Sequence, residues 1–137
     1  MSGYTGAMMH TEYDAASPLV VQRLRGQITR AQIAQGSLHA LDLIGLAAAT
    51  HGFIVLLLDL RELHFADLQA HRAWRMDFLG HPALRRHTRR VAVVGSDSPS
   101  FRAEWELLQS PVCRFFFAVQ PACAWLLEQS LPGDAVV

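Results

Sequence analysis

The sequence predicts an α/β fold, in which helices pack on a parallel or mixed sheet. Three apolar runs rich in strand-forming residues, Phe53–Leu60, Arg89–Gly95 and Val112–Val119, have the continuous pattern of strands that are buried on both faces. Segments with helical periodicity separate these runs, and such alternation is typical of a sheet covered by helices. The chain has 137 residues, of which 51% are hydrophobic and 18% charged, so it can form a single domain with one core.

Alternation and capping residues predict the elements that precede the first buried run. Residues 1–15 are expected to form a flexible tail, because they are small, mixed and without periodicity. The segment Val20–Ile28 alternates between apolar and polar side chains, which predicts a half-exposed strand. The segment Ile28–Gly52 is predicted to be a helix that Thr29 caps and Gly52 ends.

Three further helices are predicted between and after the buried strands. One spans Ala66–Leu79, with Asp67 favourably placed near its N-terminal end. Another begins after Ser98, a good N-cap, with Pro99 as a good first helical residue. The last lies in "QPACAWLLEQS" and precedes a C-terminal tail over residues 132–137.

Composition excludes several classes of protein. The formal net charge is zero, so no overall field that attracts nucleic acid or anionic membrane is expected. The longest apolar run is far shorter than the roughly 20 residues that cross a bilayer, and no signal peptide is seen. The spacing of Cys113 and Cys123 matches no zinc site. Buried thiols in a reducing compartment are favoured over a disulfide, and the protein is expected to be cytoplasmic.

Several segments together resemble a known family. The order "RLRGQIT", "GFIVLLLDLRELHF", "RRVAVVG" and a closing "ACAWL" resembles the SpoIIAA-like proteins, small bacterial proteins of the STAS fold. The resemblance implies a four- to five-stranded mixed sheet with about four helices packed mainly on one face, formed by residues 16–131. It also implies a module that docks a partner protein or senses a ligand, with no enzyme activity and no cofactor. The related CRAL-TRIO fold adds the alternative of a small apolar, lipid-like ligand.

The segment Asp59–Ala70 resembles the phosphorylation switch of anti-sigma factor antagonists. That switch follows the pattern D-L-x-x-L-x-F-x-D-S-S-G, and the chain keeps its frame, including Phe65 and Asp67. Leu68 and Gln69 stand in place of the two serines, and Ala70 replaces the glycine. Because an amide side chain cannot accept phosphate, the resemblance implies the scaffold of a switch without its phosphoserine.

The predicted functional surface surrounds this junction. It comprises the partner- or ligand-binding residues His64, Asp67, Gln69, His71, Trp74 and Phe78. Trp74 and Phe78 could instead belong to the core, since the apolar stripe of their helix is poorly defined. His64, Asp67 and His71 have a spacing that metal ligands could use, but no fourth ligand is evident. A hydrogen bond between Asp67 and His71 is favoured over a metal site.

Two other clusters have simpler explanations than chemistry. Gly95 and Ser96 follow a strand, where small anions often bind, yet the surrounding sequence is neither a nucleophile motif nor a P-loop. The arginines of "HPALRRHTRR" could bind phosphate, although a solvated loop leading into a strand is favoured. A homodimer is also considered, because one flat face of the sheet would be left without helices.

Overall fold

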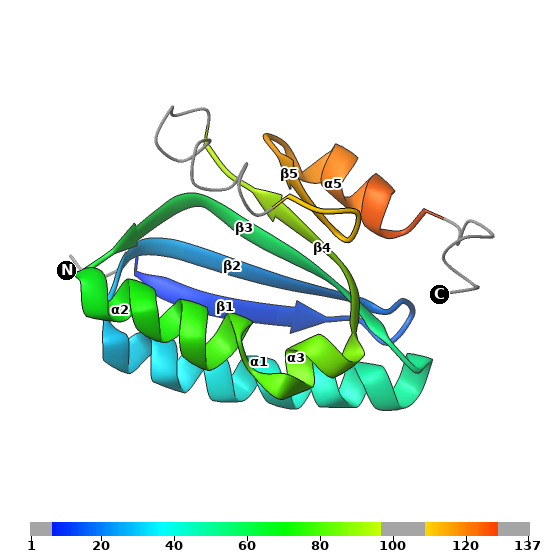
Figure 1. The fold of residues 1–137 in the computed structure, drawn as a ribbon, viewed down its shortest axis with the longest axis horizontal. Coiled ribbons are helices and arrows are strands. Elements are labelled where there is room, and N and C mark those ends of the chain that lie inside the picture. The colour runs from blue at the N-terminus through cyan, green and yellow to red at the C-terminus, as the bar shows by residue number, and fades with distance from the viewer. Residues whose placement is uncertain (1–6, 97–108, 129–137) are drawn as a thin grey trace.

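A five-stranded sheet organises the part of the chain that the computed structural model describes, residues 7–96 and 109–128 (Figure 1). The strands lie in the order β1-β2-β3-β4-β5. They span Met8–Tyr13 (β1), Leu19–Ile28 (β2), Ile54–Phe65 (β3), Thr88–Val94 (β4) and Cys113–Phe116 (β5). The helical segments span Arg30–His51 (α1), Leu68–Ala73 (α2), Trp74–Leu79 (the π-helical η2), Pro82–His87 (α3) and Val119–Leu126 (α5).

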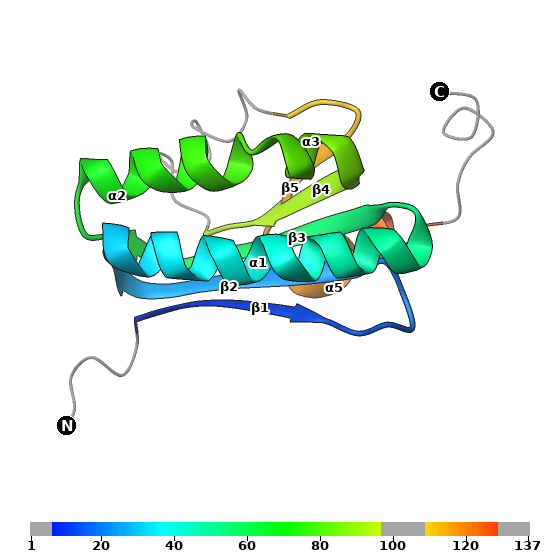
Figure 2. The ribbon, with the colours of Figure 1, turned by 90° about the horizontal axis from the view of Figure 1, so that it is seen from below.

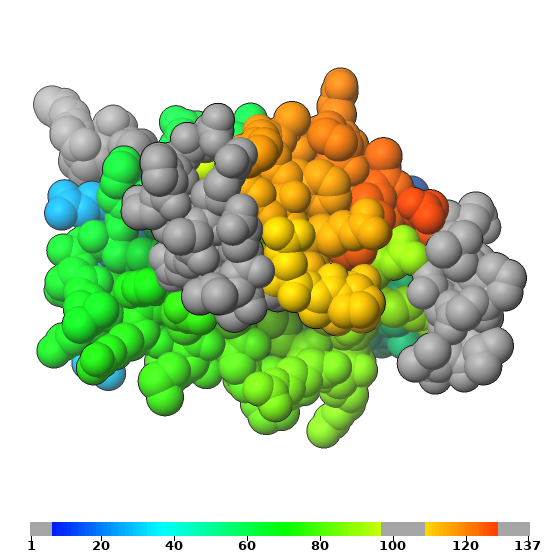
Figure 3. Space-filling view, turned by 45° about the horizontal axis from the view of Figure 1, so that its top comes forward, coloured from blue at the N-terminus to red at the C-terminus, as the bar shows by residue number. Residues whose placement is uncertain are grey.

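The sheet is mixed, as predicted. β1 pairs with β2 in antiparallel fashion, and the pairs β2–β3, β3–β4 and β4–β5 are parallel. The helices α1, α2 and α3 cover one face of the sheet, and α5 lies on the other (Figures 1 and 2). Figure 3 shows that β5 and α5 form one continuous patch over part of that second face. Since α5 lies there, the expected face without helices is partly covered.

Each face of the sheet carries its own core. The larger core lies under α1, α2 and α3 and receives alternate side chains of β2 and β3, such as Leu24, Leu56 and Leu58. The smaller core lies under α5 and contains the opposite alternation of β3, Val55 and Leu57. β3 is therefore buried on both faces over its first half, which explains its unbroken apolar run.

The ends of α1 confirm the capping residues that the sequence predicts. The Thr29 hydroxyl accepts a hydrogen bond from the Gln32 N–H, and the Gln32 side-chain oxygen accepts one from the Thr29 N–H at 2.8 Å. This capping box satisfies two of the N–H groups that a helix start leaves unpaired. At the other end Gly52 has a φ of 85°, the left-handed conformation that glycine adopts without strain.

The expectation of a flexible tail over residues 1–15 was wrong for Met8–Tyr13. These residues form β1, which pairs along its whole length with Val20–Arg25 of β2. Met9 and Tyr13 pack against the larger core, while His10 and Glu12 point to the other face. The segment is too polar to show a strand signal by itself, and its pairing with β2 decides its structure.

Two predicted boundaries in the middle of the chain also needed correction. β3 does not end at Leu60 but continues to Phe65, because its last four residues pair with Arg25–Ile28 of β2 after an irregularity in register. The segment expected to be a solvated loop contains α3, in which Pro82 stands at the start and the His81 ring accepts a hydrogen bond from the Ala83 N–H.

The remaining predictions concern the second half of the chain. The helix expected after Ser98 and the tail over residues 132–137 lie outside the described residues. The closing strand was expected to end at Val119, but β5 ends at Phe116 and the last helix, α5, begins at Val119. No helix in the described ranges is long and apolar enough to cross a membrane.

Candidate functional site

The junction between β3 and α2 is held by backbone and capping hydrogen bonds. The Ala66 N–H donates to the Ile28 carbonyl at 2.9 Å, which fastens the end of β3 to the end of β2. Asp67 is the N-cap of α2, and its carboxylate accepts a hydrogen bond from the Ala70 N–H at 2.8 Å. The predicted helix start near Asp67 is thus confirmed, and the carboxylate has a structural partner.

The helix formed by α2 and η2 turns its two large aromatic residues into the core. Trp74 and Phe78 are both 0% exposed. The Trp74 indole N–H donates to the Gln22 side-chain oxygen at 3.2 Å, so its polar atom is satisfied inside the core. The prediction that Trp74 and Phe78 belong to a binding surface was wrong for this conformation, because neither reaches the surface.

The two histidines of the junction do not come together. Leu63 and Phe65 pack into the larger core, so His64, between them on β3, points to the opposite face of the sheet. The His71 ring instead stacks on Phe65, with ring centroids 4.7 Å apart and an interplanar angle of 20°. Among the described residues no three His, Cys, Asp or Glu side chains are grouped as metal ligands.

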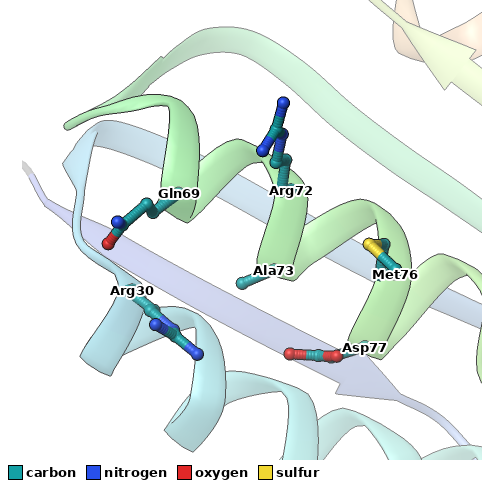
Figure 4. Close-up of a pocket in the computed structure, with 6 residues that line it drawn as sticks. All are labelled: Arg30, Gln69, Arg72, Ala73, Met76 and Asp77. Carbon is teal, nitrogen blue, oxygen red and sulfur yellow. The ribbon is translucent and has the colours of Figure 1, made fainter.

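A groove between α1 and α2 is lined by one of the predicted residues, Gln69, which is exposed. We call it the α1–α2 groove, and it is lined by Arg30, Gln69, Arg72, Ala73, Met76 and Asp77 around a cavity of about 250 Å³. Figure 4 shows Arg30 reaching toward the groove from the first turn of α1 and Asp77 facing it from η2, with Gln69 at one end. The Arg72 side chain lies on the far side of α2 and points away from α1.

The polar side chains of this groove have no partners within residues 7–96 and 109–128. Neither Arg30, Gln69 nor Asp77 takes part in a hydrogen bond or ion pair there. Met76, also on the lining, is 71% exposed, the largest exposed fraction among the large apolar side chains described. The groove therefore offers donors at Arg30 and Gln69, an acceptor at Asp77 and an apolar contact at Met76. Local sequence signals could not reveal Arg30, which lies 39 positions before Gln69.

The predicted anion site after β4 lacks a free donor at its first residue. Gly95 is buried, and its N–H donates to the Phe116 carbonyl at 3.0 Å. The prediction that Gly95 helps to bind an anion was therefore wrong, since β5 already uses its N–H. Ser96 is the last described residue before the gap and remains a prediction.

The predicted arginine cluster is divided by the fold. Arg85 and Arg86 are exposed on α3. The Arg89 guanidinium lies over the Phe53 ring, 3.8 Å from its centroid. Arg90 donates a hydrogen bond to the Trp125 carbonyl at 2.8 Å and fastens α5 to β4. Arg89 and Arg90 therefore have structural contacts within the fold. The interpretation of this segment as one solvated loop predicted no such contacts.

The thiols of Cys113 and Cys123 are free and partly buried. The sequence had favoured buried thiols over a disulfide. Burial raises the pKa of the Cys113 thiol. Burial also raises the pKa of the Cys123 thiol, and the charge of Arg23 opposes this only in part. Both thiols are therefore held in the protonated form, which is the less reactive one.

A charged network on the other face of the sheet was not predicted. Asp59 on β3 is only 8% exposed, and Arg61 donates two hydrogen bonds to its carboxylate, at 2.9 and 2.8 Å. Arg23 on β2 lies 3.9 Å from the same carboxylate. Burial alone would raise the pKa of Asp59, but the hydrogen bonds and charge of Arg61, with the charge of Arg23, outweigh it and lower the pKa.

We expect this network to stabilise the fold in a pH-dependent way. At neutral pH, Asp59→Asn should lower the free energy of unfolding by about 1 kcal/mol, because charged hydrogen bonds are lost. Since the folded-state pKa lies below the ordinary value of about 3.9, the contribution is present above that value and is lost as the pH falls through the folded-state pKa. Urea denaturation of both proteins across this range measures it. A difference that stays constant to the lowest pH would contradict the assignment, and Glu62→Gln, at an exposed ion pair with Arg25, is the control.

Comparisons with known proteins bear on the fold. No family model and no curated protein matches the chain. An uncharacterised DUF3478-family protein with a SpoIIAA-like fold, from Shewanella loihica PV-4, superposes with a TM-score of 0.61 at 22% identity, over 92% of this chain and 98% of its own. The phosphorylated form of SpoIIAA, a cell fate determinant of Bacillus, superposes with a TM-score of 0.50 at 15% identity, over 84% of this chain and 95% of its own. The protein therefore has the SpoIIAA-like, STAS-type fold.

Proposed function

We propose that the protein is a non-enzymatic binding module that docks a segment of a partner protein in the α1–α2 groove. The observation that carries the proposal is the set of unpartnered polar groups beside an exposed apolar one. Arg30 and Asp77 have no ion-pair partner within the described chain, and Met76, which also lines the groove, is 71% exposed. Exposed methionine with arginine is typical of surfaces that bind other proteins.

The chemistry of the groove defines the partner segment. Arg30 and Gln69 would receive a carboxylate, and Asp77 would receive a cation or an N–H donor. Ala73 and Met76 would contact an apolar side chain between these two groups. The expected partner segment therefore carries an acidic residue and a basic residue on either side of an apolar one. Charges arranged in this way would also select the direction in which the segment binds.

The proposed docking differs from a phosphoserine switch. Gln69 lies in the groove at a position where the resemblance to anti-sigma factor antagonists implies a serine. Its amide cannot be phosphorylated, so we infer that docking here is constitutive or is controlled by the partner. The free thiols Cys113 and Cys123 support a cytoplasmic location for this interaction.

The alternative of an apolar ligand carrier has no specific observation in its favour. It depended on a loosely packed helix between Ala66 and Leu79. In the structure Trp74 and Phe78 of this helix are fully buried against the sheet. The helix therefore has a well-formed inward face, and we do not propose a carrier.

Charge reversal in the groove tests the proposed docking. The wild-type protein is used to isolate binding partners from lysate of its source cells, and each candidate partner is then purified and titrated by calorimetry. We expect Arg30→Glu and Asp77→Arg each to weaken binding at least tenfold, because each places a like charge against the partner. Met76→Ala should weaken binding less, since it removes only apolar contact.

The matched control is Arg85→Glu, which reverses an arginine that is also exposed but lies on α3 outside the groove. It should bind the partner as the wild-type protein does. If Arg30→Glu and Asp77→Arg also bind as the wild-type protein does, the docking site is wrong. If a purified partner is chemically changed on incubation with the protein, the non-enzymatic function is wrong.

A further inference from the structure

The two most exposed large apolar side chains among the described residues belong to the two helices that border the α1–α2 groove. Met76 of η2 lines the groove and is 71% exposed, and Leu38 of α1 is 68% exposed. Leu38 lies about 80° around α1 from Arg30, which places it on the groove side of the exposed face. Leu46, also exposed, lies about 160° from Arg30 and is turned away from the groove.

The two walls of the groove are helical ridges. Because α1 and α2 follow the parallel strands β2 and β3, they run in the same direction and begin at the same end of the sheet (Figures 1 and 2). Side chains four positions apart form each wall, namely Arg30, Ala34 and Leu38 on α1 and Gln69, Ala73 and Asp77 on α2 and η2. The space between two such ridges accepts the ridge of a third helix.

Backbone hydrogen bonding also favours a helix over an extended segment in this groove. Both walls are helical, so their backbone groups bond within α1, α2 and η2 and present no strand edge. An extended segment would have only the side chains of Arg30, Gln69 and Asp77 to satisfy its backbone groups. A helix satisfies its own backbone and needs only side-chain contacts, as in other helix-binding grooves.

We propose that the partner segment in the α1–α2 groove is an amphipathic helix that runs antiparallel to α1 and α2. The inference rests on the proposed function and adds the conformation, direction and spacing of the segment. Arg30 lies in the first turn of α1, so its charge and the positive end of the α1 dipole lie at the same end of the groove. The negative C-terminal end of an antiparallel helix would lie there, with its positive N-terminal end toward Asp77.

The positions of the groove residues define the spacing of side chains in the partner helix. Leu38 follows Arg30 by eight residues, or about 12 Å along α1. In an antiparallel helix, an apolar residue on Leu38 therefore comes about seven positions before an acidic residue on Arg30. A basic residue on Asp77 and an apolar residue on Met76 lie between them. The expected order is apolar, basic, apolar and acidic at i, i+3, i+4 and i+7, which places all four on one face.

Two synthetic peptides test the conformation and direction of the partner. The first is an alanine-rich helix with leucine, lysine, leucine and glutamate in this order and spacing, and the second has proline at i+5, which breaks the helix. Titration into ¹⁵N-labelled protein, followed by NMR, should shift the resonances of Arg30, Gln69 and Asp77. The helical peptide should bind at least fivefold more tightly than the proline peptide. A spin label at its N-terminus should broaden the Leu38 resonance more than that of Arg30, and a C-terminal label should do the reverse.

A matched pair of leucine variants tests the apolar contact on α1. Leu38→Glu should weaken binding of the helical peptide at least fivefold. Leu46→Glu is the control, since Leu46 is 56% exposed on the same helix but faces away from the groove, and it should leave binding unchanged. Circular dichroism confirms that each variant is folded.

The outcomes separate this inference from the proposed docking. Equal binding of the two peptides, the reverse pattern of spin-label broadening, or unchanged binding by Leu38→Glu each overturns the antiparallel helix. So does a helical peptide that shifts no resonance of the groove. None of these results decides the docking site itself, which is tested by Arg30→Glu and Asp77→Arg against the partner isolated from lysate.

Discussion

Replacing Trp74 with alanine is expected to lower the free energy of unfolding by about 3–5 kcal/mol. The side chain is fully buried between η2 and the sheet, so its removal leaves a large cavity that the surrounding strands cannot close. Alanine also removes the indole N–H that donates to the side chain of Gln22, a residue that is itself 0% exposed. Urea denaturation, followed by far-ultraviolet circular dichroism, measures the loss.

The packing and hydrogen-bond contributions of Trp74 can be separated. Trp74→Phe keeps most of the apolar volume but leaves the Gln22 side-chain oxygen without this donor, which should cost about 1–3 kcal/mol. Gln22→Leu in the same background removes the buried amide and should recover part of the loss. If Gln22→Leu makes Trp74→Phe less stable still, the hydrogen bond is not the reason for the cost.

Two glycines of α1 are expected to respond in opposite directions to alanine. A Cβ at Gly36 would lie 2.6 Å from the Met9 sulfur and 2.9 Å from the Met9 Cβ, closer than real atoms approach. We expect Gly36→Ala to destabilise the fold by about 1–3 kcal/mol, because β1 must move away from α1. At Gly45 a Cβ would meet nothing within 4 Å. Gly45→Ala should therefore stabilise the fold by about 0.5–1 kcal/mol through its helix propensity.

The contrast isolates the contact between α1 and β1. Both variants make the same chemical change in the same helix, so helix propensity alone predicts the same sign for both. Met9→Ala in the Gly36→Ala background removes the sulfur and Cγ, the two atoms that overlap most, but keeps the Cβ, and it should recover part of the stability. Thermal unfolding at one fixed protein concentration compares the wild-type protein with these three variants. Stabilisation by both glycine variants would show that β1 does not pack closely on α1.

Much of the fold follows from local residues. The ends of α1 are marked by Thr29 and Gly52, whose capping roles depend only on neighbouring backbone. The buried half of β3 and the core of β4 stand out as unbroken apolar runs, because a strand covered on both faces has no polar side. The resemblance to the STAS fold then placed these elements in one mixed sheet, which the structure confirms.

The parts that could not be predicted depend on residues far apart in the sequence. β1 becomes a strand because β2 pairs with it, and the extension of β3 beyond Leu60 has the same cause. The helix of Trp74 and Phe78 has a weak apolar stripe, and only its position over the sheet decides that both aromatic residues face inward. For this reason Gln69 lines the α1–α2 groove as part of the candidate site, whereas Trp74 and Phe78, which were predicted to belong to the same surface, lie in the core.

The sequence by itself determined which segments form the central strands and helices of this protein, and that Leu68 and Gln69 replace the serines of the switch pattern at the junction after β3. Those properties depend on side-chain type and on neighbours within a few positions. Tertiary structure alone decided that Arg30 joins Gln69 and Asp77 in a groove, that Arg23 and Arg61 both lie beside Asp59, and that Met8–Tyr13 form the first strand of the described sheet. Each of these brings together residues from different elements, and their separation in space is set by the pairing and packing of the whole sheet.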